Sequence, residues 1–169
     1  MGSDIQAYVE YKAEKDQEWT FLANVKLQSD IMLFAMLGIG GTGLEPVVAS
    51  RGFPKDDVSE EVFLEYSMDV VEEPNSGRDC STEDAMDLVD KKISKWIDEN
   101  HNYISRPDFF SPSFITLEEL KEAVARKKSI KWEKVKVVQA SGVDVDCTIA
   151  CMEAAEKAGF KTRLVFWFY

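Results

Sequence analysis

Two short segments of this chain have residue types that could hold a phosphate group. The first, Gly38-Ile39-Gly40-Gly41-Thr42-Gly43, spells Gly-x-Gly-x-x-Gly, and glycine lets backbone amides come close to an anion. Its surroundings do not fit a dinucleotide fold, which needs a strand before the glycines and a helix after them. Here we expect a helix before them, and Leu44-Glu45-Pro46 follows. We therefore interpret the segment as a loop whose backbone at Gly40 and Gly41 is open to a ligand.

The second segment is Arg51-Gly52-Phe53-Pro54, which lies just before an expected helix. It combines a permanently charged guanidinium with a conformationally free glycine backbone and a rigid proline, so it suits an anion-binding loop. The alternative is that Arg51 pairs with Asp56 or Asp57 and only fixes the turn. Asp4, at the head of the first expected strand, could orient Arg51 or a ligand hydroxyl. The candidate ligand-binding residues are Asp4, Tyr8, Gly40, Gly41, Arg51, Phe53, Ser113 and Phe114.

Patterns typical of catalysis are missing from the sequence. There is no serine elbow, no catalytic cysteine pattern and no pair of carboxylates at a recognisable spacing. The three cysteines contain no Cys-x-x-Cys pair, and His101 is the only histidine. We therefore predict a binding protein with no catalytic residue, metal or cofactor. A metal-dependent nucleotide or phosphodiester hydrolase that uses acidic residues is the alternative.

The charge balance disfavours nucleic acid as a partner. Thirty-one acidic and 20 basic residues give a net charge of −11, which repels a phosphate backbone. The acids are spread along the chain, which favours a role in solubility; an acidic mimic of nucleic acid that blocks a DNA-binding or RNA-binding enzyme such as a nuclease is the alternative. No apolar run approaches the length of a membrane span, and the start lacks a secretion signal. We expect a cytoplasmic protein with no membrane partner.

The apolar pattern predicts a small sheet that brings the two ends of the chain together. With 169 residues, 45% of them hydrophobic, the chain can form one domain over 1–169. Residues 4–12 and 19–27 alternate between apolar and polar side chains, which predicts an antiparallel hairpin. Residues 164–169 are apolar on both faces and should form a central or inserted strand.

Helices are expected between these strands. Asp30 or Ser29 can cap the first helix and Gly38 can end it, while Thr116 and Glu119 form a capping-box pattern. The expected helices cover 31–37, 60–73, 81–100, a segment after Thr116, and a segment capped by Asp144 or Asp146 that ends at Gly159. The pattern of residues 130–140 favours neither a helix nor a strand. The predicted fold class is α+β, with a small, mostly antiparallel sheet packed against several helices.

Three segments in fixed order resemble a family of small bacteriophage proteins. They are Met1-Gly2-Ser3-Asp4-Ile5, Arg51-Gly52-Phe53-Pro54-Lys55-Asp56-Asp57-Val58-Ser59 and Arg163-Leu164-Val165-Phe166-Trp167-Phe168. The family opens Met-Gly-Cys-Asp-Ile-His, carries Arg-Gly-Leu-Pro-Asp-Asp-Val-Ser and closes on Arg-Leu-Val-Phe-Trp-Phe-Asp. This chain has Gln6 and Pro112 where the family has histidines, so we do not expect histidine chemistry here.

The resemblance implies a phage-encoded counter-defence factor that works in the cytoplasm of the host bacterium. Such a protein would sequester a nucleotide-like immune signal or block a host defence protein. Aromatic side chains on the surface would also suit a homo-oligomer, which the sequence leaves open.

Overall fold

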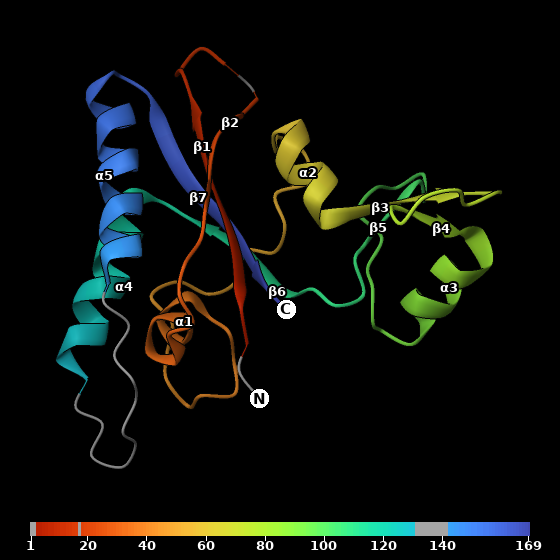
Figure 1. Cartoon of the computed structure of the whole chain (residues 1–169), viewed down its shortest axis with the longest axis horizontal. Coiled ribbons are helices and arrows are strands. Elements are labelled where there is room, and N and C mark those ends of the chain that lie inside the picture. Colours follow the sequence, from red (N-terminus) through yellow and green to blue (C-terminus); the bar gives the residue numbers. More distant parts are fainter. Residues whose placement is uncertain (1–2, 17, 131–141) are drawn as a thin grey trace.

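A four-stranded antiparallel sheet forms the centre of the molecule (Figure 1). The computed structural model describes residues 3–16, 18–130 and 142–169. The strand order is β2-β1-β7-β6, so the first and last strands of the chain lie side by side in the middle. This confirms the expected hairpin and the inserted C-terminal strand. The strands are β1 (Ile5–Lys12), β2 (Thr20–Val25), β6 (Phe110–Ile115) and β7 (Lys161–Phe168).

Three helices, α1 (Ile31–Leu37), α4 (Leu117–Ser129) and α5 (Val143–Lys157), cover one face of this sheet (Figure 1). Alternate side chains of a strand point to opposite faces. Leu164, Phe166 and Phe168 of β7 therefore face these helices, and each is completely buried. This apolar layer is the main core of the molecule, while Arg163, Val165 and Trp167 point to the other face.

The helix ends mostly follow the sequence signals. The Asp30 carboxylate accepts hydrogen bonds from the first turn of α1, and Gly38 ends that helix with φ of 94°. Thr116 and Glu119 form the expected capping box at the start of α4. The cap expected for α5 is wrong, because the helix begins after Gly142 and Asp144 already lies in its first turn.

A smaller lobe lies beyond the opposite face of the main sheet (Figure 1). It contains a three-stranded sheet of order β4-β3-β5, with β3 and β4 parallel. Aromatic side chains, Trp167 among them, pack between α2 and the main sheet. The elements on this side are α2 (Glu60–Tyr66), β3 (Ser67–Val71), β4 (Asp79–Ser81), α3 (Thr82–Asp90) and β5 (Tyr103–Ser105).

Two helix lengths predicted for this lobe are wrong. The helix that starts at Glu60 gives way to strand β3 at Ser67, and α3 ends at Asp90 instead of near residue 100. After α3 the chain turns, and Trp96 pairs with Ile104 in an isolated antiparallel bridge. Tertiary pairing has overridden the helical spacing of the apolar residues. Most of the unassigned segment 130–140 lies outside the described residues.

None of the helices in the described ranges has the length and apolar composition needed to cross a membrane.

Candidate ligand-binding site

The non-helical face of the main sheet has a buried ion pair at its centre. Antiparallel register places Glu10 on β1 opposite Arg163 on β7. Glu10 is 0% exposed and Arg163 is 4% exposed. Arg163 Nε donates to Glu10 Oε1 at 2.8 Å, and the Ser59 backbone amide donates to Oε2 at 2.7 Å. A charge out of water is tolerated only when it is paired and hydrogen-bonded, so these contacts hold the Arg163 guanidinium in place.

The outer side of the Arg163 guanidinium contacts a second carboxylate. Its Nη1 donates to Asp57 Oδ1 at 3.1 Å, and the indole Nε1 of Trp19 donates to Asp57 Oδ2 at 3.1 Å. The guanidinium carbon also lies 4.3 Å from the centre of the Trp19 ring. Arg163 Nη2 lies 2.8 Å from Glu10 Oε1, but has no partner with hydrogen-bond geometry among the described residues. Some of the donor capacity of Arg163 is therefore unused.

Arg51 forms the neighbouring part of the site, but not with the expected partner. Its guanidinium makes two hydrogen bonds with the Glu119 carboxylate, of 2.6 and 2.7 Å. These bonds lower the pKa of Glu119 and raise that of Arg51. The predicted pairing of Arg51 with Asp56 or Asp57 is wrong, because Asp57 pairs with Arg163 instead. The pairing with Glu119 ties the Arg51 segment to the start of α4.

The ring of Phe114 lies against both arginines. The guanidinium carbons of Arg51 and Arg163 are 5.4 and 5.3 Å from its centre, within the range of cation–π attraction. Lys12 Nζ lies 4.9 Å from the centre of the Trp19 ring. Cations and aromatic faces therefore alternate across this part of the surface.

These side chains line an open cleft of about 570 Å³. Clefts of this size hold small organic ligands. The turn that follows Pro54 forms one wall, and β6, β7 and the end of β1 contribute the others. The lining residues are Lys12, Trp19, Arg51, Phe53, Pro54, Lys55, Asp56, Asp57, Phe114, Ile115, Thr116, Thr162 and Arg163.

Three of the residues proposed from the sequence, Arg51, Phe53 and Phe114, line this cleft together. Ser113 is buried behind them, where its Oγ accepts a hydrogen bond from the Arg51 amide at 3.1 Å. Ser113 thus supports the Arg51 loop rather than lining the cleft.

Two other proposed residues, Tyr8 and Asp4, do not line the cleft and make contacts within the fold instead. Tyr8 is 4% exposed and stacks on Trp167 at 5.2 Å between ring centres, and burial raises its pKa to about 12. Asp4 is exposed, and its backbone pairs with that of Tyr169 at the end of the sheet. Arg51 is oriented by Glu119 and Phe114, not by Asp4.

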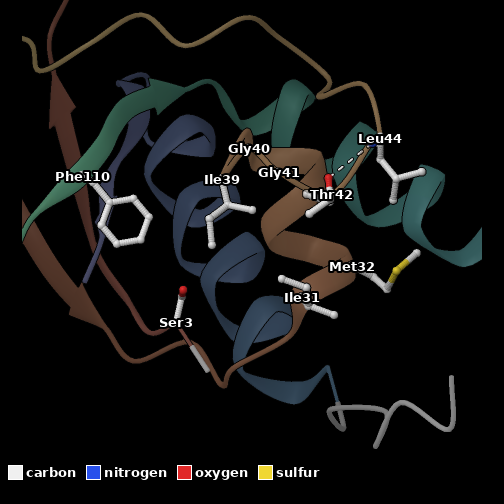
Figure 2. A pocket seen from close by; sticks show the side chains of 10 residues that line it. Ser3, Ile31, Met32, Ile39, Gly40, Gly41, Thr42, Leu44 and Phe110 are labelled. Carbon is white, nitrogen blue, oxygen red and sulfur yellow. Dashed lines mark hydrogen bonds between the residues drawn. The ribbon is translucent and has the colours of Figure 1, made fainter. Parts of the chain in front are cut away.

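The glycine loop belongs to a different cavity, shown in Figure 2. This pocket of about 410 Å³ lies beside α1, and its lining is mostly apolar. Phe110 from β6 closes one side and packs on Phe168, which belongs to the helix-covered face. Gly40 and Gly41 therefore line a different pocket from Arg51. The lining residues are Ser3, Ile31, Met32, Ala35, Ile39, Gly40, Gly41, Thr42, Leu44 and Phe110.

Sequence reasoning missed four important residues of the cleft: Lys12, Trp19, Asp57 as an ion-pair partner, and Arg163. A signal for Arg163 was present in the sequence, together with its partner Glu10. Glu10 and Arg163 are the charged residues at the buried positions of β1 and β7, and buried charges of opposite sign need each other. Their pairing could have been inferred once the two strands were placed side by side.

Within the described ranges, no group of three or more His, Cys, Asp or Glu side chains could hold a metal ion. Comparison with protein-family models, curated proteins and solved structures found no match to this chain.

Proposed function

We propose that this protein binds a nucleotide-like small molecule in the open cleft, whose lining has basic and aromatic side chains, and does not convert it to a product. The observation that carries the proposal is the lining of the cleft, where four cationic side chains alternate with the rings of Trp19, Phe53 and Phe114. Aromatic faces stack on planar bases, and cationic side chains attract phosphates. A molecule that has both a base and a phosphate uses both features of the lining.

The lysines supply the positive charge that a ligand can reach without breaking an ion pair. Arg51 and Arg163 are already neutralised by Glu119, Glu10 and Asp57. Neither Lys12 nor Lys55 forms an ion pair with another described residue. Both can therefore turn toward a phosphate while the arginines keep the aromatic walls in position.

The resemblance to small phage proteins supports a biological setting for this binding. In a phage-infected bacterium, a protein that holds a nucleotide-like immune signal in the host cytoplasm would prevent that signal from reaching its receptor. Tight binding alone is sufficient for such a counter-defence role.

Direct docking on a host defence protein is the second candidate, and the small lobe favours it. Residues 60–109 contain 14 acidic and five basic side chains, which accounts for most of the net charge of −11. An acidic lobe suits a basic protein surface, including one that normally binds nucleic acid. This docking would occur at a surface separate from the cleft.

The test is isothermal titration calorimetry with adenosine 5′-monophosphate, a cyclic dinucleotide, ADP-ribose and adenosine. We expect at least one phosphorylated compound to bind, and the K12A/K55A variant to bind it at least about tenfold more weakly. The K91A/K95A variant is the matched control, because it removes two exposed lysines of the small lobe. Equal losses of affinity in K12A/K55A and K91A/K95A, or no binding of any of these compounds by the wild-type protein, would refute the proposal.

Native mass spectrometry of the same mixtures separates binding from hydrolysis. The proposal predicts that the bound compound is recovered with unchanged mass. A product of lower mass would show that the protein is an enzyme.

A further inference from the structure

We infer that the Asp57 carboxylate occupies the place of the ligand's phosphate, and that the cleft selects phosphorylated compounds because only they displace it. The inference rests on the proposed function and names the chemical class that this site prefers. It starts from the two hydrogen bonds of the Asp57 side chain, which come from donors on different parts of the chain.

The two donors form a receptor for an oxyanion. Arg163 Nη1 and the Trp19 indole each donate to a different oxygen of Asp57, and both distances are 3.1 Å. A phosphate can present two oxygens in the same way and accepts strong, charge-assisted hydrogen bonds. Arg163 remains in place when the anion changes, because Glu10 holds the other side of its guanidinium.

Asp57 is the movable member of the group. Its side chain is 40% exposed, whereas those of Arg163 and Glu10 are 5% and 0% exposed. The Asp57 end of this pair is open to solvent, which screens the attraction, so a charged ligand can compete with it. The backbone carbonyl of Asp57 accepts a separate hydrogen bond from the Trp19 amide at 3.1 Å. Rotation of the side chain alone therefore clears the receptor, and the turn keeps its backbone contact.

Selectivity follows from this competition. A phosphate group carries up to two charges and replaces the single charge of the carboxylate, whereas an unphosphorylated nucleoside has no group that can do so. The nucleoside keeps only the aromatic contacts with the cleft. Asp57 thus acts as an internal competitor that the correct ligand must displace.

The experiment compares D57N with D56N by calorimetry, using adenosine 5′-monophosphate and adenosine. The two variants change the net charge equally, and their sites are adjacent in one turn, but the Asp56 side chain makes no hydrogen bond to another described residue. We expect D57N to bind the monophosphate about fivefold to tenfold more tightly than wild type, and D56N to change its affinity less than about twofold. Affinity for adenosine should be the same in all three proteins.

Each outcome of this comparison supports or overturns the inference about Asp57. An equal gain in both variants would overturn the inference and leave the proposed function standing, because general electrostatics would then explain the gain. Weaker binding by D57N would also overturn it, since Asp57 would then be a ligand contact. Tighter binding of the monophosphate by D57N alone, with measurable binding by the wild type, would support the inference. If neither variant nor the wild type binds the monophosphate, the inference fails, and so does the proposed binding of this nucleotide in the cleft.

Discussion

The two faces of the four-stranded sheet are built from alternate residues of the same strands, yet they differ in composition and accessibility. The helix-covered face is closed and apolar, with Leu164, Phe166 and Phe168 at its centre. The opposite face has the buried Glu10–Arg163 pair beside an open cleft. From this difference we expect the helix-covered face to supply most of the stability, and we propose that the opposite face holds the ligand.

The largest expected effect is loss of the apolar core on the helix-covered face. Phe166→Ala should lower the free energy of unfolding by about 3–5 kcal/mol, because the side chain is completely buried and leaves a cavity. Urea unfolding followed by circular dichroism measures this change. A loss below about 1 kcal/mol would mean that this face is not the main source of stability.

The buried ion pair should be the most sensitive point on the opposite face. Glu10→Gln removes the charge that balances Arg163 and should lower the free energy of unfolding by about 3 kcal/mol at neutral pH. The same urea titration measures it, with K91A as a control at the exposed Lys91–Asp87 pair, where we expect less than about 0.5 kcal/mol. Similar values for the two variants would contradict the structural role assigned to Glu10.

Phe114→Leu should separate binding from stability. The ring is only half-buried, so its loss should cost about 1–2 kcal/mol of unfolding free energy, less than at Phe166. Nucleotide binding should fall about tenfold or more, since stacking on an aromatic ring is worth about 1–3 kcal/mol per base. Calorimetry measures the nucleotide affinity, and urea unfolding of the same sample measures the free energy of unfolding. Unchanged nucleotide affinity would remove Phe114 from the site.

The smallest expected effect concerns pH and the Arg51–Glu119 pair. Arg51 lowers the pKa of Glu119 below its usual value of 4.5, so this carboxylate stabilises the folded state above that pH. Its contribution is lost as pH falls through the lowered pKa. The side chains are partly exposed, so we expect less than about 1 kcal/mol. Thermal unfolding of wild type and E119Q should differ at about pH 6 and converge toward about pH 3; a constant difference would contradict this.

Local signals in the sequence predicted much of the fold. Alternation predicted the hairpin, a run apolar on both faces predicted the C-terminal strand, and Asp30, Gly38 and the Thr116–Glu119 box correctly marked helix ends. Errors arose where long-range pairing competes with local spacing, as in the chain after Asp90, which bridges to β5 instead of continuing as a helix.

The candidate site was harder to predict because it depends on pairing between distant segments. The Arg51 loop and Phe114 were identified from their residue types, and both line the cleft. Glu10 and Arg163 meet only through the register of β1 and β7, 153 positions apart in sequence. The glycine loop was grouped with Arg51, but the two line different pockets, which spacing along the chain could not reveal.

The most direct test of the binding face is a ¹H–¹⁵N NMR titration with adenosine 5′-monophosphate that follows the tryptophan indole N–H signals. The Trp19 indole donates to Asp57 in the cleft, whereas Trp96 lies in the small lobe and serves as an internal reference. W19F and W96F variants assign the two signals. The account predicts a saturable shift of the Trp19 signal while the Trp96 signal stays in place. An unchanged Trp19 signal at millimolar nucleotide, or equal shifts at both indoles, would contradict it.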